Sequence, residues 1–216
     1  MDFKRSRPAL WLVLVVLLSS LIGSAVGKYV ETVRFADKVT FTAKLADKLV
    51  LLEHEAVRQS NGEYILDKHN TVTENYYHLL PGLDIPKDPY VQVTGKTDIP
   101  AILYVEVVKE LTDEALMYTI DPKHWLLLEG VGGKNGGMVY VFTVDTHNPA
   151  EIGAEFNSNP VNILTNDILV VGQNLKHSTA ADKLKFYACM GETTSSDAAD
   201  LTEKAKEVYK TVNNMT

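Results

Sequence analysis

The histidines are the side chains best suited to chemistry, and their spacing does not favour a metal centre. No two of them lie at the short intervals that bring a pair of imidazoles to one metal ion, and the zinc-protease motif H-E-x-x-H is absent. In "LLEHEAV" the acids Glu53 and Glu55 flank His54, and on a strand they would face away from it. A zinc site would therefore need residues far apart in the sequence. The six histidines are His54, His69, His78, His124, His147 and His177.

Two further enzyme motifs can be tested directly. The chain contains no G-x-S-x-G, which excludes the nucleophile elbow of an α/β-hydrolase. The glycine-rich stretch "GVGGKNGG" (Gly130–Gly137) suggests a phosphate-binding loop, but it lacks the Lys-Ser/Thr ending. The residues after it, "MVYVFTV", have the pattern of a strand, not of a helix. We therefore predict a flexible hairpin loop, which at the end of a β-sandwich could contact a partner.

Acidic residues and tyrosines offer weaker possibilities. Asp84 with Asp88, or Asp145 with Glu151, could bind calcium, but no D-x-D-x-D-G spacing supports either pair and solvated loop acids are the default. A tyrosine strip could bind sugar, although half of the tyrosines on alternating strands belong in a core. We predict no catalytic residue, no metal and no cofactor. The tyrosines of that strip would be Tyr76, Tyr77, Tyr104, Tyr118 and Tyr187.

Charge and cysteine content narrow the class of protein. A net charge of -7, with no basic patch after residue 10, argues against nucleic acid as a partner. The single cysteine, Cys189, permits no intrachain disulfide, so stability must come from the core. We interpret Cys189 as a half-buried strand residue; the alternative is an intermolecular bridge.

The first residues have the pattern of a secretory signal peptide. Lys4, Arg5 and Arg7 precede the uncharged run "WLVLVVLLSSLIGSAVG", which ends in small residues. Ala25 and Gly27 suit the positions before a signal-peptidase cut, so we predict cleavage between Gly27 and Lys28. The alternative is an uncleaved membrane anchor, for which the apolar run is barely long enough. Removal of residues 1–27 would leave a net charge of -9.

The rest of the chain is predicted to be all-β with one C-terminal helix. "KVTFTAKL" alternates, with Val39, Phe41, Ala43 and Leu45 on one face. Asn61-Gly62 favours a tight hairpin after "DKLVLLEHE". Many short strands between Gly, Pro and Asn turns indicate a sandwich or jelly roll, with "NPAEIGAEFN" supplying at most one helical turn. Further strands are predicted at 63–66, 75–79, 90–94, 101–109, 116–120, 125–129, 138–144, 168–171 and 184–190.

The C-terminal helix is predicted from "DAADLTEKAKEVYKTV". Ser195 or Ser196 would cap it, and Asp197 and Asp200 would lie in its first turn, where the helix dipole favours acids. An apolar stripe would pack on the sandwich or bind a partner. The stripe is formed by Ala198, Leu201, Ala205, Val208 and Val212.

The stretch "LLPGLDIPKDPYVQV" is predicted to be a rigid connector between strands. Its prolines cannot donate to a β-ladder, so they should break pairing, and its aspartates can bond backbone amides in turns. It contains no nucleophile and no phosphate cradle, and we interpret it as a crossover between strands, which could join two sheets. The connector residues are Pro81, Gly82, Asp84, Pro86, Asp88 and Pro89.

A family resemblance rests on three pieces of sequence. A signal peptide precedes a strand, "LLPGLDIPKDPYVQVTGKTDIPAILYVEV" follows, and "LKFYACM" closes the domain. This arrangement resembles the TasA/camelysin family of exported Gram-positive surface and biofilm-matrix proteins. Pro81-Gly82 matches its "PG" turn, and Ala101–Val107 matches its "A-x-L-Y-V-x-V" strand. The sequence departs from the family after the signal, where "GKYVETVRFADK" replaces "AYFT"-like residues.

The resemblance implies a jelly-roll-like β-sandwich at residues 28–190, followed by a linker and helix at 191–216. It also implies a secreted subunit of a matrix fibre or cell-surface layer, which polymerises when the N-terminal strand of one copy completes the sheet of the next. Its partners would be itself, other matrix proteins, and a signal peptidase during export. The alternatives are that Val39–Leu45 pairs within its own sheet, that the protein is a camelysin-like metalloprotease, or that it is a monomeric adhesin-type module.

Overall fold

The structure is a computed structural model of the whole chain. It describes residues 49–73, 75, 77, 82, 84–94, 99–109, 116–153, 159–172, 184–194 and 198–215. Contacts divide the chain into Met1–Val39 and Thr40–Thr216, and every described residue belongs to the second unit. Several predicted features lie outside the described residues: the cleavage region Ala25, Gly27 and Lys28, the strand residues Val39, Phe41, Ala43 and Leu45, and the connector residue Pro81.

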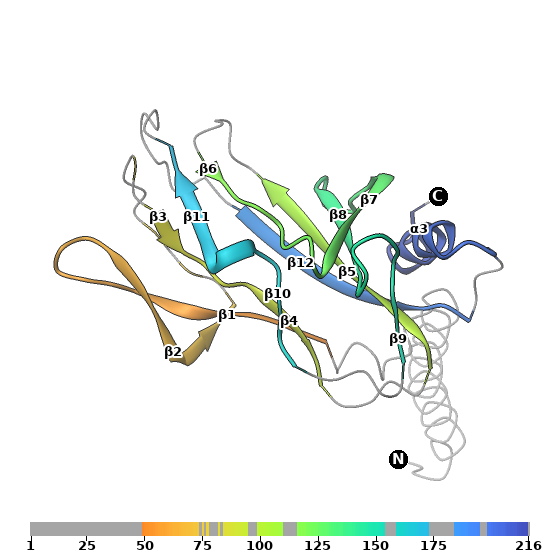
Figure 1. Cartoon of the computed structure of the whole chain (residues 1–216), viewed down its shortest axis with the longest axis horizontal. Helices are drawn as coiled ribbons and strands as arrows, with labels where there is room; N and C mark the ends of the chain where they lie inside the picture. The colour runs from red at the N-terminus through yellow and green to blue at the C-terminus, as the bar shows by residue number, and fades with distance from the viewer. Residues whose placement is uncertain are drawn as a thin grey trace, which may run out of the picture. The chain divides into compact units, whose positions relative to one another are not determined.

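The described residues form three antiparallel sheets and one α-helix (Figure 1). This confirms the all-β class with a C-terminal helix. The four-stranded sheet has the order β10 (Val161–Asn162), β4 (Tyr90–Val93), β1 (Leu49–Arg58), β2 (Tyr64–Val72). The three-stranded sheet has the order β3 (Asp84–Pro86), β11 (Ile168–Val171), β6 (Leu116–Met117). The five-stranded sheet runs β12 (Leu184–Glu192), β5 (Ala101–Lys109), β8 (Met138–Phe142), β7 (Trp125–Gly132), and β9 (Glu151–Ile152) also pairs with β5.

Strand β5 is the centre of the fold because both of its faces are buried. Leu103 and Val105 point into a core shared with Val91 of the four-stranded sheet. Ile102 and Tyr104 point the other way, into a second core covered by α3 (Leu201–Val212). This explains the nearly continuous apolar run "AILYVEVVK", since a strand covered on both sides needs apolar residues at every position.

Helix α3 packs on the five-stranded sheet and contacts β12, β5 and β7 (Figure 1). Its buried side chains include Val208 and Val212, as the apolar stripe predicted. Gly191 permits the close approach, because a Cβ there would lie 2.4 Å from Val208 and 2.6 Å from Val212. The predicted cap was wrong: the helix begins at Leu201, and Asp200 caps it by accepting a hydrogen bond from the Thr202 amide.

The structure agrees with some of the predicted strands and shortens or replaces others. The Asn61-Gly62 hairpin is confirmed, with β1 and β2 paired antiparallel and Gly62 at φ +91°. The strand expected at 116–120 is limited to Leu116–Met117, with an isolated bridge at Ile120. Of the strand expected at 75–79, Asn75 and Tyr77 lie outside strands. The stretch expected to give a helical turn forms β9 in its described part.

The connector prediction needs a correction. The prolines were expected to break pairing, but Pro86 ends β3 and pairs with Ile168 of β11. Proline is tolerated there because β3 is the edge of its sheet. The expected change of sheet does occur, since β3 and β4 belong to different sheets. Pro89 precedes β4 and accepts a hydrogen bond from the Ile163 amide, while Gly82 turns the chain at φ +77°.

Candidate functional site

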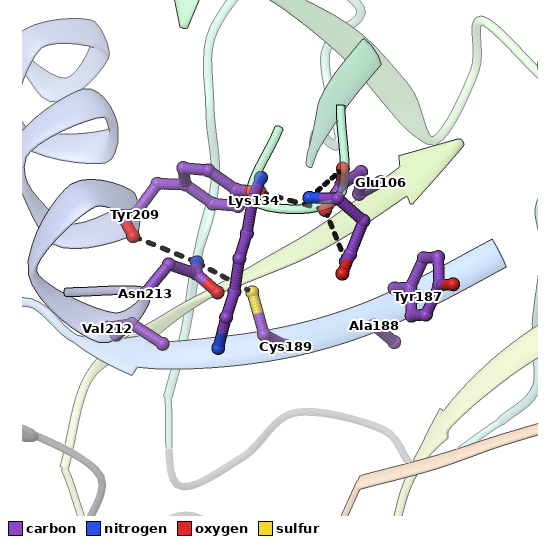
Figure 2. Close-up of a pocket in the computed structure, with 9 residues that line it drawn as sticks. Glu106, Lys134, Tyr187, Ala188, Cys189, Tyr209, Val212 and Asn213 are labelled. Carbon is purple, nitrogen blue, oxygen red and sulfur yellow. Dashed lines mark hydrogen bonds between the residues drawn. The ribbon is translucent and has the colours of Figure 1, made fainter. Parts of the chain in front are cut away.

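A hollow lies between β12, α3 and the loop that joins β7 to β8 (Figure 2). Its volume is about 340 Å³. The strand contributes Tyr187, Ala188 and Cys189, and the helix contributes Tyr209, Val212 and its C-cap residue Asn213. Lys134 and Asn135 come from the loop, and Glu106 comes from β5.

Glu106 is a buried carboxylate held by four hydrogen bonds. Its Oε1 accepts from the backbone amides of Asn135 (2.7 Å) and Gly137 (2.9 Å). Its Oε2 accepts from the Asn135 side chain (2.9 Å) and the Tyr209 hydroxyl (3.3 Å). Because charged acceptors in a dry environment require such donors, these bonds compensate for the burial of the charge.

The glycine-rich loop thus binds an anion, but the anion is a side chain of the same protein. The predicted hairpin loop is confirmed, because β7 and β8 pair on either side of it. A Cβ on Gly133 would lie 2.1 Å from Glu106 Oε1, and one on Gly137 would lie 2.4 Å from the Val107 carbonyl oxygen. The glycines are therefore needed for close approach of the loop to β5.

The Cys189 thiol and the Tyr209 hydroxyl are held in their neutral forms. Burial raises the pKa of Cys189 to about 12, and burial also raises the pKa of Tyr209 above its ordinary value. The Asn213 side chain donates to the Tyr209 carbonyl (3.0 Å) and contacts the Cys189 sulfur (3.7 Å). Cys189 is accordingly a poor nucleophile at neutral pH.

A second polar cluster surrounds Asp88, which is only 3% exposed. Its carboxylate accepts from the His54 amide (3.0 Å) and Lys68 Nζ (2.7 Å), and it contacts His54 Nδ1 at 2.6 Å. Burial alone would raise the pKa of Asp88, but the hydrogen bonds from Lys68 and His54 outweigh burial and lower it. Glu53 and Lys87 form a buried ion pair beside it. Asp88 was expected to accept hydrogen bonds from amides in nearby turns. Its partners instead lie on β1 (His54) and β2 (Lys68), so it links the connector to both strands.

The remaining sequence candidates are not brought together. His124 contacts Asp121 at 2.7 Å, while His69 and His147 are exposed. Asp145 accepts from the amides of His147 and Asn148, whereas Glu151 pairs with Lys204. Across the described ranges, no three His, Cys, Asp or Glu side chains are grouped as metal ligands would be. His78 and His177 lie outside those ranges, and so does Tyr76.

The tyrosines expected to form a sugar-binding strip have separate environments. Tyr104 is fully buried beneath α3, where its hydroxyl donates to the Ala205 carbonyl. Tyr187 is 39% exposed at the pocket. Tyr77 donates to the Pro86 carbonyl at 2.9 Å. These three therefore do not share one exposed face.

The outer edge of β12 is the third feature of interest. All nine of its residues pair with β5, and among the described residues no strand pairs with its other side. Leu184, Phe186 and Ala188 pack against the core between the sheets but are only half-buried. This strand therefore presents a backbone edge beside partly exposed apolar side chains.

Sequence reasoning missed the Glu106 pocket. The available signal was an acid in the middle of an otherwise apolar strand, which requires nearby donors once both faces are buried. It could not reveal that those donors would come from the glycine-rich loop and from the helix. The partners of Asp88 were equally hidden, because they lie 20 and 34 residues away.

Together these features define an antiparallel all-β protein with a C-terminal helix, a polar pocket and a sheet edge that no described strand covers. Comparison with protein-family models, with curated proteins and with solved structures finds no match to this chain. Among the described residues, no helix is long and apolar enough to span a bilayer.

Proposed function

We propose that this chain is a secreted structural protein, a subunit of an extracellular matrix fibre or cell-surface layer. Its fold would be a jelly-roll-like sandwich of the TasA/camelysin kind, exported by the signal peptide at residues 1–27. Assembly would occur when the strand predicted at Lys38–Leu45 of one copy adds to the outer edge of β12 in the next, which no described strand covers. Its partners are then other copies of itself and other matrix proteins.

The observation that carries this proposal is the edge of β12. Exposed edge strands recruit other strands, and natural proteins usually protect them with charge, proline or a covering element. From Phe186 to Gly191 the strand contains neither charge nor proline. The half-buried Phe186 and Ala188 add apolar surface that a further strand would cover.

The predicted strand at 38–45 suits this edge. Its apolar residues Val39, Phe41, Ala43 and Leu45 alternate with polar ones, as one covered face requires. A strand near a free terminus can leave its own domain at little cost in other contacts. Main-chain hydrogen bonds would supply affinity, and the alternating side chains would supply register.

Electron microscopy of the chain beginning at Lys28 tests the proposal, beside a version that lacks residues 28–45. Fibres are expected from the first and not from the second. Tyr187→Lys places a charge on the edge strand at a side chain that is 39% exposed, and it should reduce assembly. Leu127→Lys is the matched control, because Leu127 is 43% exposed on β7, the opposite edge of the same sheet.

Each result of these microscopy experiments has a different meaning for the proposal. Loss of fibres in Tyr187→Lys but not in Leu127→Lys supports β12 as the acceptor. If the chain beginning at Lys28 is folded and stays monomeric over days at several pH values, the fibre function is wrong. Equal fibre yield from the truncated and the intact chain would eliminate the N-terminal strand as the donor.

A further inference from the structure

The two sides of β12 differ in chemistry. Phe186 and Ala188 point into the core between the sheets. Tyr187 and Cys189 alternate with them and line the pocket beneath α3. A strand that pairs beside β12 must therefore place one face against an apolar core and the other face over a polar pocket, whose lining residues are shown in Figure 2.

We propose that the pocket between β12 and α3 receives Thr40 and Thr42 of a second copy of this chain. The inference rests on the proposed function and adds the orientation of the incoming strand, that is, which of its two faces lies over the pocket. With the threonines over the pocket, Val39, Phe41 and Ala43 of the incoming strand enter the core beside Phe186.

The pocket has partners for small hydroxyl side chains. The Asn213 amide group uses its nitrogen to donate to Tyr209, and no described residue donates to its oxygen. Lys134, which lines the same pocket, carries an ammonium group that can donate. A threonine hydroxyl can donate and accept at once, so it suits a site with both kinds of group.

Charge and size favour the same orientation. Glu106 and Lys134 line the pocket together and have opposite charges, so the site does not select a strongly charged ligand. Lys38 and Lys44 flank the threonines, and their long side chains can reach water past the pocket. The reverse orientation would bury both threonine hydroxyls in the apolar core and expose Phe41 to a polar surface.

Disulfide trapping tests the orientation, because Cys189 is the only thiol in the chain. Single cysteines are placed in the chain beginning at Lys28, either at Thr40 and Thr42 or at Phe41 and Ala43. Neighbouring residues on one face of paired strands come close enough for a disulfide, whereas residues on opposite faces do not. Assembled samples are oxidised by dissolved oxygen with a copper catalyst at pH 9 and run on non-reducing gels.

Thr40→Cys or Thr42→Cys should give covalent ladders at least tenfold more abundant than Phe41→Cys or Ala43→Cys. Adding Cys189→Ser to the same chains should abolish the ladders. Slow oxidation of Cys189 affects all four chains equally and leaves the ratio intact.

Three results would overturn the inference in different ways. Ladders from Phe41→Cys or Ala43→Cys alone would mean that the apolar face of the incoming strand lies over the pocket, while the proposed fibre function is unaffected. Fibres with no ladder from any position would place the incoming strand away from β12. A disulfide formed within one chain, without fibres, would mean that the segment pairs with its own β12, and the fibre function then fails as well.

Discussion

Replacing Glu106 by alanine would remove the acceptor of four hydrogen bonds from the glycine-rich loop and α3. Hydrogen bonds to charged groups contribute about 1.5–3 kcal/mol each, but donors that regain water recover much of this. Asn135 is exposed and can be rehydrated, whereas the Gly137 amide and the Tyr209 hydroxyl are less accessible. We therefore expect Glu106→Ala to reduce the free energy of unfolding by about 3–5 kcal/mol, because two poorly hydrated donors lose their acceptor and the missing side chain leaves a cavity.

Glu106→Gln is a milder change at the same position. The amide retains one acceptor oxygen, so the bonds to the two backbone amides can persist. Its nitrogen is then placed against the Asn135 side-chain donor, and the tyrosine hydroxyl must turn to accept. The expected loss is about 1–2 kcal/mol, which lies near the net value of one or two ordinary hydrogen bonds.

Urea unfolding followed by tryptophan fluorescence measures these changes. Removal of residues 1–27 leaves Trp125 as the only tryptophan, and it is 3% exposed in the same sheet as Glu106. Glu129→Ala is the matched control, because Glu129 is an exposed acid on β7 and should change stability by less than about 0.5 kcal/mol. If Glu106→Ala and Glu129→Ala unfold at the same urea concentration, the loop and helix do not depend on this carboxylate.

Three further predictions follow from packing and from pKa shifts. Gly137→Ala should lose about 1–3 kcal/mol by overpacking against the β5 backbone, while Gly132→Ala, which has open space around it, should not, as urea unfolding would show. The lowered pKa of Asp88 means that its ionised form stabilises the fold above about pH 4 and that this contribution is lost as pH falls through the folded pKa. Asp88→Asn should therefore have a lower free energy of unfolding than the wild type at pH 7, and it should lose less of that free energy on acidification below pH 4. The exposed control Asp84→Asn should show neither change, and parallel pH profiles for the two variants would contradict the prediction. With a pKa raised from 9.0 to about 12, Cys189 should react with iodoacetamide at pH 8 about a thousandfold more slowly than an ordinary thiol, and labelling at the ordinary rate would refute the assigned burial.

The strands were predictable where local patterning and tertiary burial agree. The hairpin at Asn61-Gly62 follows from turn chemistry alone, and β5 and β11 were predicted with their observed ends. The helix start was missed because several residues before Leu201 can cap, and packing against Gly191 decides where the helix lies. Strand β3 was missed because three prolines argue against pairing, a rule that weakens at a sheet edge.

The candidate site was much less predictable than the fold. Asp84 and Asp88 are similar in the sequence, yet one is exposed and the other is held by His54 and Lys68. Which acid becomes buried depends on the register between β1 and the connector, and no local pattern encodes that register. The chemistry of such a side chain is set by tertiary contacts formed across 20 or more residues.

Glu106 shows why a charge persists in β5, where eight of the nine residues are buried. An apolar residue of similar size at this position could pack under α3, but it would leave the donors of the 133–137 loop without an acceptor. The carboxylate fixes the loop and, through Tyr209, the helix that forms the far wall of the pocket. The shape of the pocket beside the β12 edge therefore depends on one side chain of the neighbouring strand. If that pocket orients an incoming strand, Glu106→Gln, which leaves most of the fold in place, should lower the ratio of the ladders from Thr42→Cys to those from Phe41→Cys, whereas Glu129→Ala should leave that ratio unchanged.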